Sequence, residues 1–592
     1  MKKTIPFFLL AFLSLTTLLS VHWGLSYFAN LKIEEMLYEL RAPLKGSEGV
    51  ISNYLMHCLL PAGVITCILV VCLRFYRRFI KVAALIFLIL LFGSVAYFFV
   101  QVDAIHYISS QLTGSDFIEK NYVNPKDVSI TFPDRRRNLI FIYLESMETT
   151  FSDFSSGGAF DENYIPELSL LAQENEDFSG DEKMINGGYA MPGSTWTIAG
   201  MFATSSGLPL KIGLSDNAMS TQNDFFPNII TLGDLLESAG YRQVFQLGSD
   251  VTFGGRKVLM TDHGHFEFRD YNYALEHNLI PPDYKEFWGY EDEKLFSFSR
   301  DTLTELAAGD QPFNFTMITV DTHTPEGYKC RLCGDEYNLP YKNALCCSSK
   351  QVSDFIEWIQ GQPFYGNTTI VLTGDHPTMA GAICDDIDPD YLRKTFTCII
   401  NPACSRSENK SRTFTTFDIF PTTLAALGVS IDGDRLGLGT NLFSSVPTLS
   451  EIYGYEAESE EVMKKSEFLS ELEKIDSKSQ QMIELFKNVE PAEKISFSKG
   501  DRLISVVSSD MSEYADLIEH IKVKFWYYDG PHYIIQNLTL KHHHEGDRLV
   551  YKSEMDAENF MKFDEVHYQF YVKTPETGYV DLGKDGIVTA EP

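Results

Sequence analysis

The sequence predicts an α/β protein in three parts: N-terminal transmembrane helices, a large domain built on a mostly parallel sheet flanked by helices, and a small β-rich unit at the C-terminal end. Three observations support this class. Long apolar runs fill the first 105 residues, strand-like and helix-like segments then alternate to about residue 450, and β-rich segments follow residue 495. Of 592 residues, 44% are hydrophobic and 22% are charged, which excludes a disordered chain.

Three apolar runs, Ile5–Phe28, Tyr54–Leu73 and Val82–Val100, open the chain with lengths of 24, 20 and 19 residues. Each is long enough to cross a hydrocarbon core of about 30 Å as a helix. A cleaved signal peptide is the alternative for the first run, but this run is too long for the apolar core of such a peptide, and residues 26–29 form a poor cleavage site. We therefore expect residues 1–103 to form a membrane domain with three transmembrane helices.

The basic residues give the expected orientation in the membrane. Lys2 and Lys3 precede the first run, and the link over residues 74–81 carries four basic residues and no acidic one. Positively charged loops stay in the cytoplasm, so we expect everything after about Asp103 to lie outside. Residues 1–105 carry a net charge of +4, whereas the whole chain carries −32. So acidic a protein is a poor candidate for binding nucleic acid.

The outer part is expected to contain a juxtamembrane connector over residues 104–137, a catalytic α/β domain over 138–450, an acidic helical linker over 451–494 and a small β domain over 495–592. The strands of the α/β domain are continuous apolar runs, which is typical of a parallel sheet covered by helices on both faces. A helix is expected over residues 229–238, closed by Gly240. The predicted strands are Leu139–Leu144, Gln243–Leu247, Phe315–Val320 and Thr369–Leu372, followed in the tail by Val523–Tyr528 and Tyr533–Leu540.

Seven of the ten cysteines fall between Cys330 and Cys404. In an oxidising compartment, cysteines of this kind form disulfides, so we expect disulfides that pin a loop, with the pairing open and one cysteine left over. The spacing of Cys330 and Cys333 also suits zinc. However, no second pair with that spacing follows, and the adjacent Cys346 and Cys347 suit a zinc ribbon poorly.

Polar residues follow four of the predicted strands. Glu145 ends the first, Ser249 and Asp250 follow the second, residues 321–323 (Asp-Thr-His) follow the third, and residues 374–376 (Gly-Asp-His) follow the fourth. Because ligands of open α/β sheets bind beyond the carboxyl ends of the strands, these side chains are expected to meet at one edge. Any one of them alone would be read as a solvated loop acid or a satisfied histidine. The prediction of a site rests on their convergence.

The chemistry of this group suggests a metal. Glu145, Asp375 and His376 form a mixed oxygen and nitrogen donor set that suits Mn²⁺ or Zn²⁺ better than Mg²⁺. A nucleophile is expected at Ser194 or Thr195, which precede the apolar helical stretch Ile198–Phe202. At a helix N-terminus the dipole favours an alkoxide and an incoming phosphate, although an ordinary helix cap would give the same local pattern.

Five motifs in this order resemble the sulfatase-like phosphotransferases of bacterial envelopes, especially the phosphoglycerol transferases of osmoregulated periplasmic glucans; lipoteichoic-acid synthases and phosphoethanolamine transferases are more distant. The resemblance covers most of residues 138–450. It implies an alkaline-phosphatase-like fold with a mixed, mostly parallel sheet. The motifs are LESMETT at 144–150, PGSTWTIAGMFATSSGLPL at 192–210, VDTHTPEGY at 320–328, TGDHPTMA at 373–380 and DIFPTTLAALGV at 418–429.

The resemblance also implies roles for individual residues. One metal would be bound by Glu145, Ser194, Asp375 and His376, with Ser194 as the nucleophile. In the family this nucleophile is usually Thr, and Thr195 is adjacent, so a shift by one residue stays open. By motif position, His323 would contact the substrate phosphate and Arg256 would hold it.

The implied activity is transfer of glycerol phosphate from phosphatidylglycerol to a periplasmic glucan or related envelope glycan, through a covalent phospho-Ser/Thr intermediate. The enzyme would be a multi-pass protein of the bacterial inner membrane with its catalytic domain in the periplasm. A phosphoethanolamine or teichoic-acid-type transferase and an inactive glycan- or lipid-binding envelope protein are alternatives. A sulfatase is disfavoured because the Pro/Ala and Arg that guide formylglycine formation do not follow Ser194.

Overall fold

The computed structural model describes residues 4–27, 32–39, 48–180, 183–211, 225–388, 390–473, 485–486, 489–498, 503–529, 532–546, 548–556, 560, 565–574 and 579–591. The chain divides into two compact units. The first comprises residues 1–225 and 229–471, and the second comprises residues 226–228 and 472–592.

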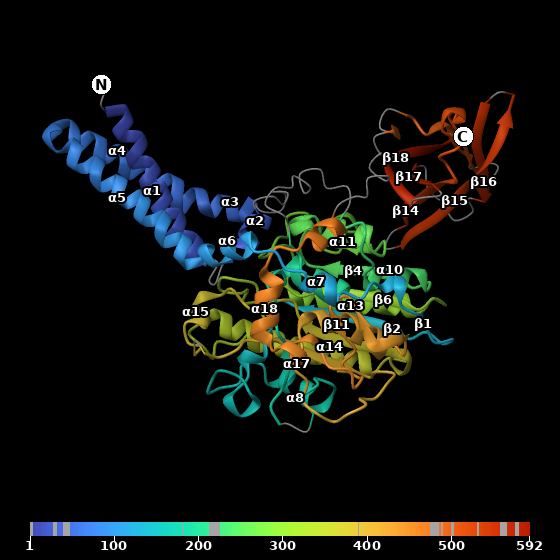
Figure 1. Ribbon diagram of the computed structural model, residues 1–592, viewed down its shortest axis with the longest axis horizontal. Helices are drawn as coiled ribbons and strands as arrows, with labels where there is room; N and C mark the ends of the chain where they lie inside the picture. The colour runs from blue at the N-terminus through green and yellow to red at the C-terminus, as the bar shows by residue number, and fades with distance from the viewer. Residues whose placement is uncertain are drawn as a thin grey trace. The chain divides into compact units, whose positions relative to one another are not determined.

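Three helices of the first unit are long and apolar enough to cross a membrane, over Ile5–Ser26, Ile51–Cys72 and Ile80–Gln101. They confirm the three predicted apolar helices. The first packs against the third, where the Ser14 hydroxyl donates to the backbone oxygen of Phe87 at 2.8 Å. The corresponding elements in Figure 1 are α1 (Thr4–Tyr27), α3 (Glu48–Tyr54), a π-helical turn (Leu55–Leu59), α4 (Leu60–Phe75) and α5 (Ile80–Gln101).

A seven-stranded sheet forms the centre of the first unit, in the order β3-β8-β7-β2-β6-β4-β5. The strands from β7 to β5 run parallel, and β8 and β3 are antiparallel additions at one edge. The predicted mixed, mostly parallel sheet is therefore confirmed. The strands are β2 (Asn138–Leu144), β3 (Gly187–Gly188), β4 (Arg242–Leu247), β5 (Glu267–Arg269), β6 (Phe313–Ile318), β7 (Thr368–Gly374) and β8 (Thr395–Ile400).

Helices cover both faces of this sheet, which explains why its central strands are apolar throughout. On one face, Ile140 and Ile142 share a buried cluster with α8 (Pro166–Glu174), α13 (Asp292–Ala307) and α14 (Pro340–Gln360). On the other face, the Tyr143 hydroxyl lies 2.9 Å from Thr204 Oγ1 on α9 (Thr197–Ser206). Next to α9 lie α10 (Leu232–Ser238) and α16 (Ile419–Ala426).

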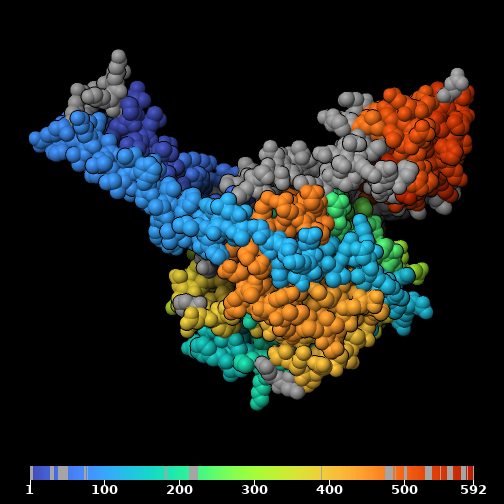
Figure 2. Space-filling model, in the orientation of Figure 1, coloured from blue at the N-terminus to red at the C-terminus, as the bar shows by residue number. Residues whose placement is uncertain are grey.

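The segment after α5 lies along the α/β domain of the first unit. It contains α6 (Ala104–Leu112) and α7 (Phe117–Asn121), and its backbone pairs with residues 437 and 465. Figure 2 shows this light-blue segment beside the orange residues that follow position 430. Here α18 (Tyr455–Met463) contacts both α6 and α7. The membrane helices are thus continuous with a connector that packs on the α/β domain.

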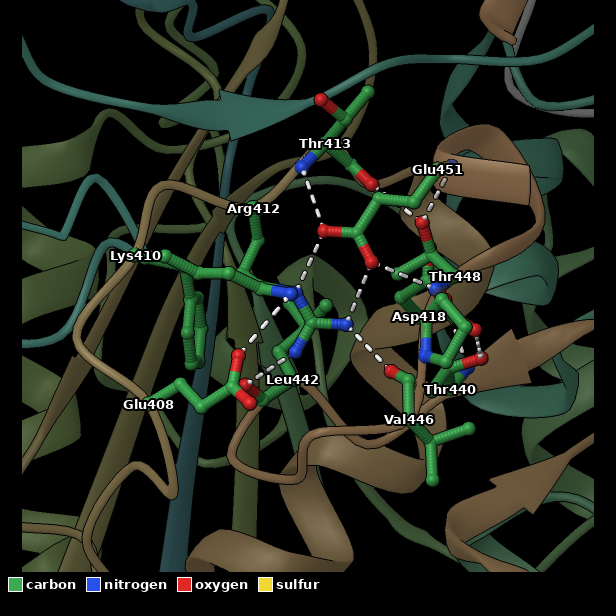
Figure 3. Close-up of polar contacts among 12 residues, drawn as sticks. Glu408, Lys410, Arg412, Thr413, Asp418, Thr440, Leu442, Val446, Thr448 and Glu451 are labelled. Carbon is green, nitrogen blue, oxygen red and sulfur yellow. Dashed lines mark hydrogen bonds and ion pairs between the residues drawn. The ribbon is translucent and has the colours of Figure 1, made fainter. Parts of the chain in front are cut away.

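A buried ion pair anchors α17 (Leu449–Tyr453) to the α/β domain (Figure 3). Arg412 contacts both carboxylate oxygens of Glu451 at 2.8 and 3.0 Å, and it also donates to the backbone oxygens of Leu442, Ser444 and Val446. Glu451 in turn completes a capping box with Thr448 at the start of α17. Arg412 therefore satisfies several carbonyl groups and one carboxylate at once.

The second unit is a closed barrel with the strand order β12-β13-β16-β15-β14-β17-β18. It has its own buried core, which includes Phe497, Phe525 and Phe570. The predicted β-rich C-terminal unit is confirmed, and both predicted strands fall within β14 and β15. The strands are β12 (Ala492–Ser498), β13 (Leu503–Ser508), β14 (His520–Asp529), β15 (His532–Glu545), β16 (Arg548–Asp556), β17 (Glu565–Lys573) and β18 (Tyr579–Glu591). The domain limits given from the sequence remain predictions.

Candidate active site

The carboxyl ends of two neighbouring parallel strands bring three of the predicted polar residues together. Glu145 directly follows β2, and Asp375 and His376 directly follow β7, its neighbour in the sheet. One ligand atom from each of these residues lies within 4.8 Å of the others, and all three are buried. The His376 Nε2 atom is 3.4 Å from Asp375 Oδ2 and 3.7 Å from Glu145 Oε1. We call Glu145, Asp375 and His376 the acidic trio.

The hydrogen bonds of the acidic trio leave ligand atoms open toward its centre. Asp375 Oδ1 accepts from the backbone N–H groups of Ser146 and His376, whereas Asp375 Oδ2 is buried without a hydrogen-bond partner. His376 Nδ1 lies 2.9 Å from the backbone oxygen of Pro377, which can only accept. Nδ1 therefore carries a proton, and Nε2 is the ring atom that can bind a metal ion.

The electrostatics of the acidic trio also fit a cation. Burial, together with the charge of Asp375, raises the pKa of Glu145 to about 8. Burial opposes a charged imidazole at His376, but the carboxylates of Asp375 and Glu145 outweigh it and raise its pKa. Two buried carboxylates with one orphaned oxygen are costly unless a positive charge lies among them. The residues present thus fit a divalent metal ion.

Ser194, the predicted nucleophile, lies in a buried turn before α9, and its role stays a prediction. Ser194 is fully buried; its hydroxyl donates to the backbone oxygen of Met191 at 2.8 Å and accepts from Thr416 Oγ1 at 3.3 Å. Instead, Thr197 Oγ1 lies 3.3 Å from His376 Nε2. The reason is local: a turn at residues 191–194 directs Ser194 inward, and α9 begins three residues later, at Thr197.

Close backbone packing brings Thr197 to the acidic trio. A Cβ atom at Gly200, one turn into α9, would lie 1.9 Å from the backbone oxygen of Asp375. Only glycine permits this approach, so α9 lies directly against the chain that carries Asp375 and His376. Thr197 is the first residue of this helix, where the helix dipole favours negative charge.

His323 and Arg256 lie in the same cavity as Thr197 and Glu145. His323 Nδ1 is 2.9 Å from the backbone oxygen of Thr324, so this nitrogen carries the proton and Nε2 can accept one. Burial lowers the pKa of His323 to about 4, which leaves the ring neutral at neutral pH. Arg256 is held at the start of α11 (Arg256–Asp262), where Nη2 donates to the backbone oxygen of Asp250 at 2.9 Å.

The cavity has a volume of about 700 Å³ and two kinds of wall. One wall carries Thr197, Arg256 and His323, together with the aromatic rings of Trp196, Phe253 and Trp288. The other wall is made by α1, α2 (Ile33–Glu39), α3 and α5. Sequence reasoning missed Thr197, Trp288 and this membrane-side wall. The sequence does contain a signal for Thr197. In the motif at residues 192–210, Gly200 follows Thr197 by one helical turn and permits a close backbone approach next to it.

Comparison with known proteins shows which family and which proteins this chain resembles. Residues 137–429 match the family model described as sulfatase. This part of the chain is similar to the sulfatase family. Phosphoglycerol transferase I of Escherichia coli O127:H6 is 32% identical over 335 residues, which make up 55% of this chain and 42% of that protein. The match to the protein of the same name from Escherichia coli SMS-3-5 has the same identity and coverage. The chain therefore spans less than half the length of these curated relatives.

Solved structures add membrane and envelope proteins to the comparison. Lipoteichoic acid synthase LtaP from Listeria monocytogenes is 18% identical, with 56% of this chain and 81% of that chain covered and a TM-score of 0.40. Lipooligosaccharide phosphoethanolamine transferase A (EptA) from Neisseria meningitidis is 14% identical, with 72% and 84% covered and a TM-score of 0.42. The match to the sulfatase family model and the 32% identity with phosphoglycerol transferase I confirm the predicted resemblance.

Proposed function

We propose that this chain is a metal-dependent phosphotransferase that moves glycerol phosphate from phosphatidylglycerol to a periplasmic glucan or related envelope glycan. The observation that carries the proposal is the position of Thr197 Oγ1, at the start of α9 and 3.3 Å from His376 Nε2. The acidic trio would hold Mn²⁺ or Zn²⁺, with Mg²⁺ less suited, and such an ion acidifies a nearby hydroxyl and offsets phosphate charge.

In the first half-reaction, Thr197 Oγ1 attacks the phosphorus of the donor lipid. The bond between phosphorus and the diacylglycerol oxygen breaks, and a glycerophosphoryl ester remains on Thr197. Arg256 binds the phosphoryl oxygens as negative charge develops. His323 Nε2 accepts the Thr197 proton and passes it to the departing diacylglycerol oxygen, which balances the step.

In the second half-reaction, an acceptor hydroxyl attacks the same phosphorus. His323 Nε2 takes the proton of the acceptor hydroxyl and returns it to Thr197 Oγ1, which restores the enzyme. Because Nδ1 is already bonded to the backbone oxygen of Thr324, Nε2 is the ring atom that can accept a proton. The two steps predict ping-pong kinetics.

The location of the enzyme is part of the proposal. The basic residues before the first span and between the second and third spans favour a cytoplasmic N-terminus and a catalytic domain in the periplasm. Anchoring in the inner membrane would hold the site next to a donor lipid that does not leave the bilayer unaided. The name of the curated relatives, phosphoglycerol transferase I, supports a phosphoglycerol headgroup.

A sulfatase reaction is less well supported, although the family model carries that name. Sulfatases form formylglycine from Cys or Ser, whereas the hydroxyl beside the acidic trio belongs to Thr197. Oxidation of a threonine side chain would give a ketone and not the aldehyde that formylglycine requires. The site therefore favours attack on phosphorus by an unmodified hydroxyl.

In the test, the protein is reconstituted in nanodiscs and supplied with either phosphatidylglycerol or phosphatidylethanolamine, each labelled in the headgroup. We expect label from phosphatidylglycerol to become protein-bound and then to move to added glucan. Thr197→Ala is expected to abolish the labelling, whereas the matched variant Ser194→Ala keeps it. If only phosphatidylethanolamine labels the protein, the proposed donor is wrong. If Thr197→Ala is labelled as strongly as wild type, the assignment of Thr197 as the nucleophile is wrong.

A further inference from the structure

The cavity that holds Thr197 extends into the membrane part of the chain. On its membrane side it is lined by Thr16, Ser20 and Trp23 of α1, Tyr54 of α3 and Phe98 of α5. All five residues lie within the spans that are long and apolar enough to cross a membrane. One continuous space of about 700 Å³ therefore joins the catalytic residues to the lipid-facing helices.

Two aromatic residues mark the depth of this membrane-side wall. Trp23 lies three residues before the end of the first span, and Tyr54 lies three residues after the start of the second. Their rings meet at 5.3 Å. At about 1.5 Å per helical residue, both are within about 5 Å of the end of their spans. Trp and Tyr at this depth are typical of the membrane interface, where the ester groups of glycerolipids also lie.

Hydroxyl groups line the wall at and below this level. Ser20 Oγ and the Tyr54 hydroxyl are 2.8 Å apart, so one donates to the other and a second O–H hydrogen remains for an acceptor. Thr16, one helical turn deeper, also lines the cavity, but its Oγ1 atom is enclosed by protein. The Ser20–Tyr54 pair is therefore the hydroxyl donor that this wall offers to a ligand.

We propose that the Ser20–Tyr54 pair donates a hydrogen bond to an ester carbonyl oxygen of the donor lipid, so that the membrane helices select diacyl glycerolipids. The inference rests on the proposed function, because that reaction requires a lipid in this cavity. With phosphorus at Thr197, the diacylglycerol part of the lipid extends toward α1 and α3. Ester carbonyls are strong acceptors, whereas the ether oxygens of a dialkyl lipid of equal length are weaker ones.

The test compares diester and diether phosphatidylglycerol of equal chain length in nanodiscs with the full-length protein. The two donors share the headgroup and the phosphate, and they differ at the carbonyls. We expect wild type to prefer the diester about fivefold in kcat/KM for adduct formation, equivalent to one hydrogen bond. The double variant Ser20→Ala/Tyr54→Phe should reduce this preference and keep the rate with the diether.

Thr66→Val is the matched control. Thr66 Oγ1 is a buried hydroxyl without a partner in a span, but Thr66 does not line the cavity, so its removal should leave the preference unchanged. The rate with the diether also reports whether each variant is folded. Equal rates with both donors in wild type, or an unchanged preference in the Ser20→Ala/Tyr54→Phe variant, would overturn the inference and leave the proposed function standing. Absence of any adduct in wild type would instead reject the proposed function.

Discussion

Gly200→Ala probes the packing that brings the nucleophile to the acidic trio. The alanine Cβ would lie 1.9 Å from the backbone oxygen of Asp375 and 2.8 Å from its carbonyl carbon. Non-bonded heavy atoms lie about 3.5 Å apart at their most favourable separation. The backbones of α9 and Asp375 must therefore move apart by more than about 1 Å to accept this Cβ atom. A displacement of about 1 Å in a reacting group lowers rates by about 100-fold. The overpacking itself should cost about 1–3 kcal/mol of unfolding free energy.

Two measurements on the full-length protein check this prediction. The rate of headgroup transfer to the protein should fall by about two orders of magnitude, and the Tm should fall by about 2–4 °C for each kcal/mol lost. Gly366→Ala is the control, since a Cβ at Gly366 meets nothing within 4 Å, and it should change neither quantity. A Gly200→Ala protein with wild-type rate and Tm would show that α9 does not rest on Asp375.

Three further predictions follow from the same geometry. Arg412→Met leaves the Glu451 carboxylate and several carbonyl groups without their hydrogen-bond donor, so chemical denaturation should show an unfolding free energy lower by about 3–5 kcal/mol. A decrease below about 1 kcal/mol would contradict the role given to this pair. A chelator should lower the Tm of wild type and added Mn²⁺ or Zn²⁺ should restore it, whereas His376→Ala should respond to neither; equal responses would reject the acidic trio as the metal site. Cys330 Sγ lies 3.6 Å from both Cys333 Sγ and Cys347 Sγ, so non-reducing peptide mapping of protein from an oxidising compartment should find Cys330 in a disulfide. If its partner is Cys347, reduction should lower the unfolding free energy by about 3 kcal/mol. If the mapping finds all three cysteines as free thiols, the disulfide prediction is wrong.

The fold could be predicted because its strands carry a strong local signal. Continuous apolar runs such as Leu139–Leu144 are buried on both faces, and the polar residue after each run marks the carboxyl end. Parallel pairing then brings Glu145, Asp375 and His376 to one edge without any knowledge of loop structure. The acidic trio therefore follows from strand periodicity and sheet topology alone.

The nucleophile could not be chosen in the same way. Ser194, Thr195 and Thr197 all precede or begin an apolar helix, and local patterns place a helix start only to within a few residues. The choice depends on the inward turn at Ser194 and on the contact of Gly200 with Asp375, which joins segments far apart in the chain. The membrane-side wall of the cavity was beyond sequence reasoning for the same reason, since Ser20 and Tyr54 meet only through helix packing.

The most direct test of the account locates the covalent group on the chain. Residues 184–211 contain no Lys or Arg before Lys211, so trypsin releases Ser194, Thr195 and Thr197 on one peptide and fragment ions must separate them. After incubation of the full-length protein with phosphatidylglycerol, the account predicts a glycerophosphoryl group on Thr197. The same group on Ser194 or Thr195, or a peptide that stays unmodified while glucan is labelled, would contradict it.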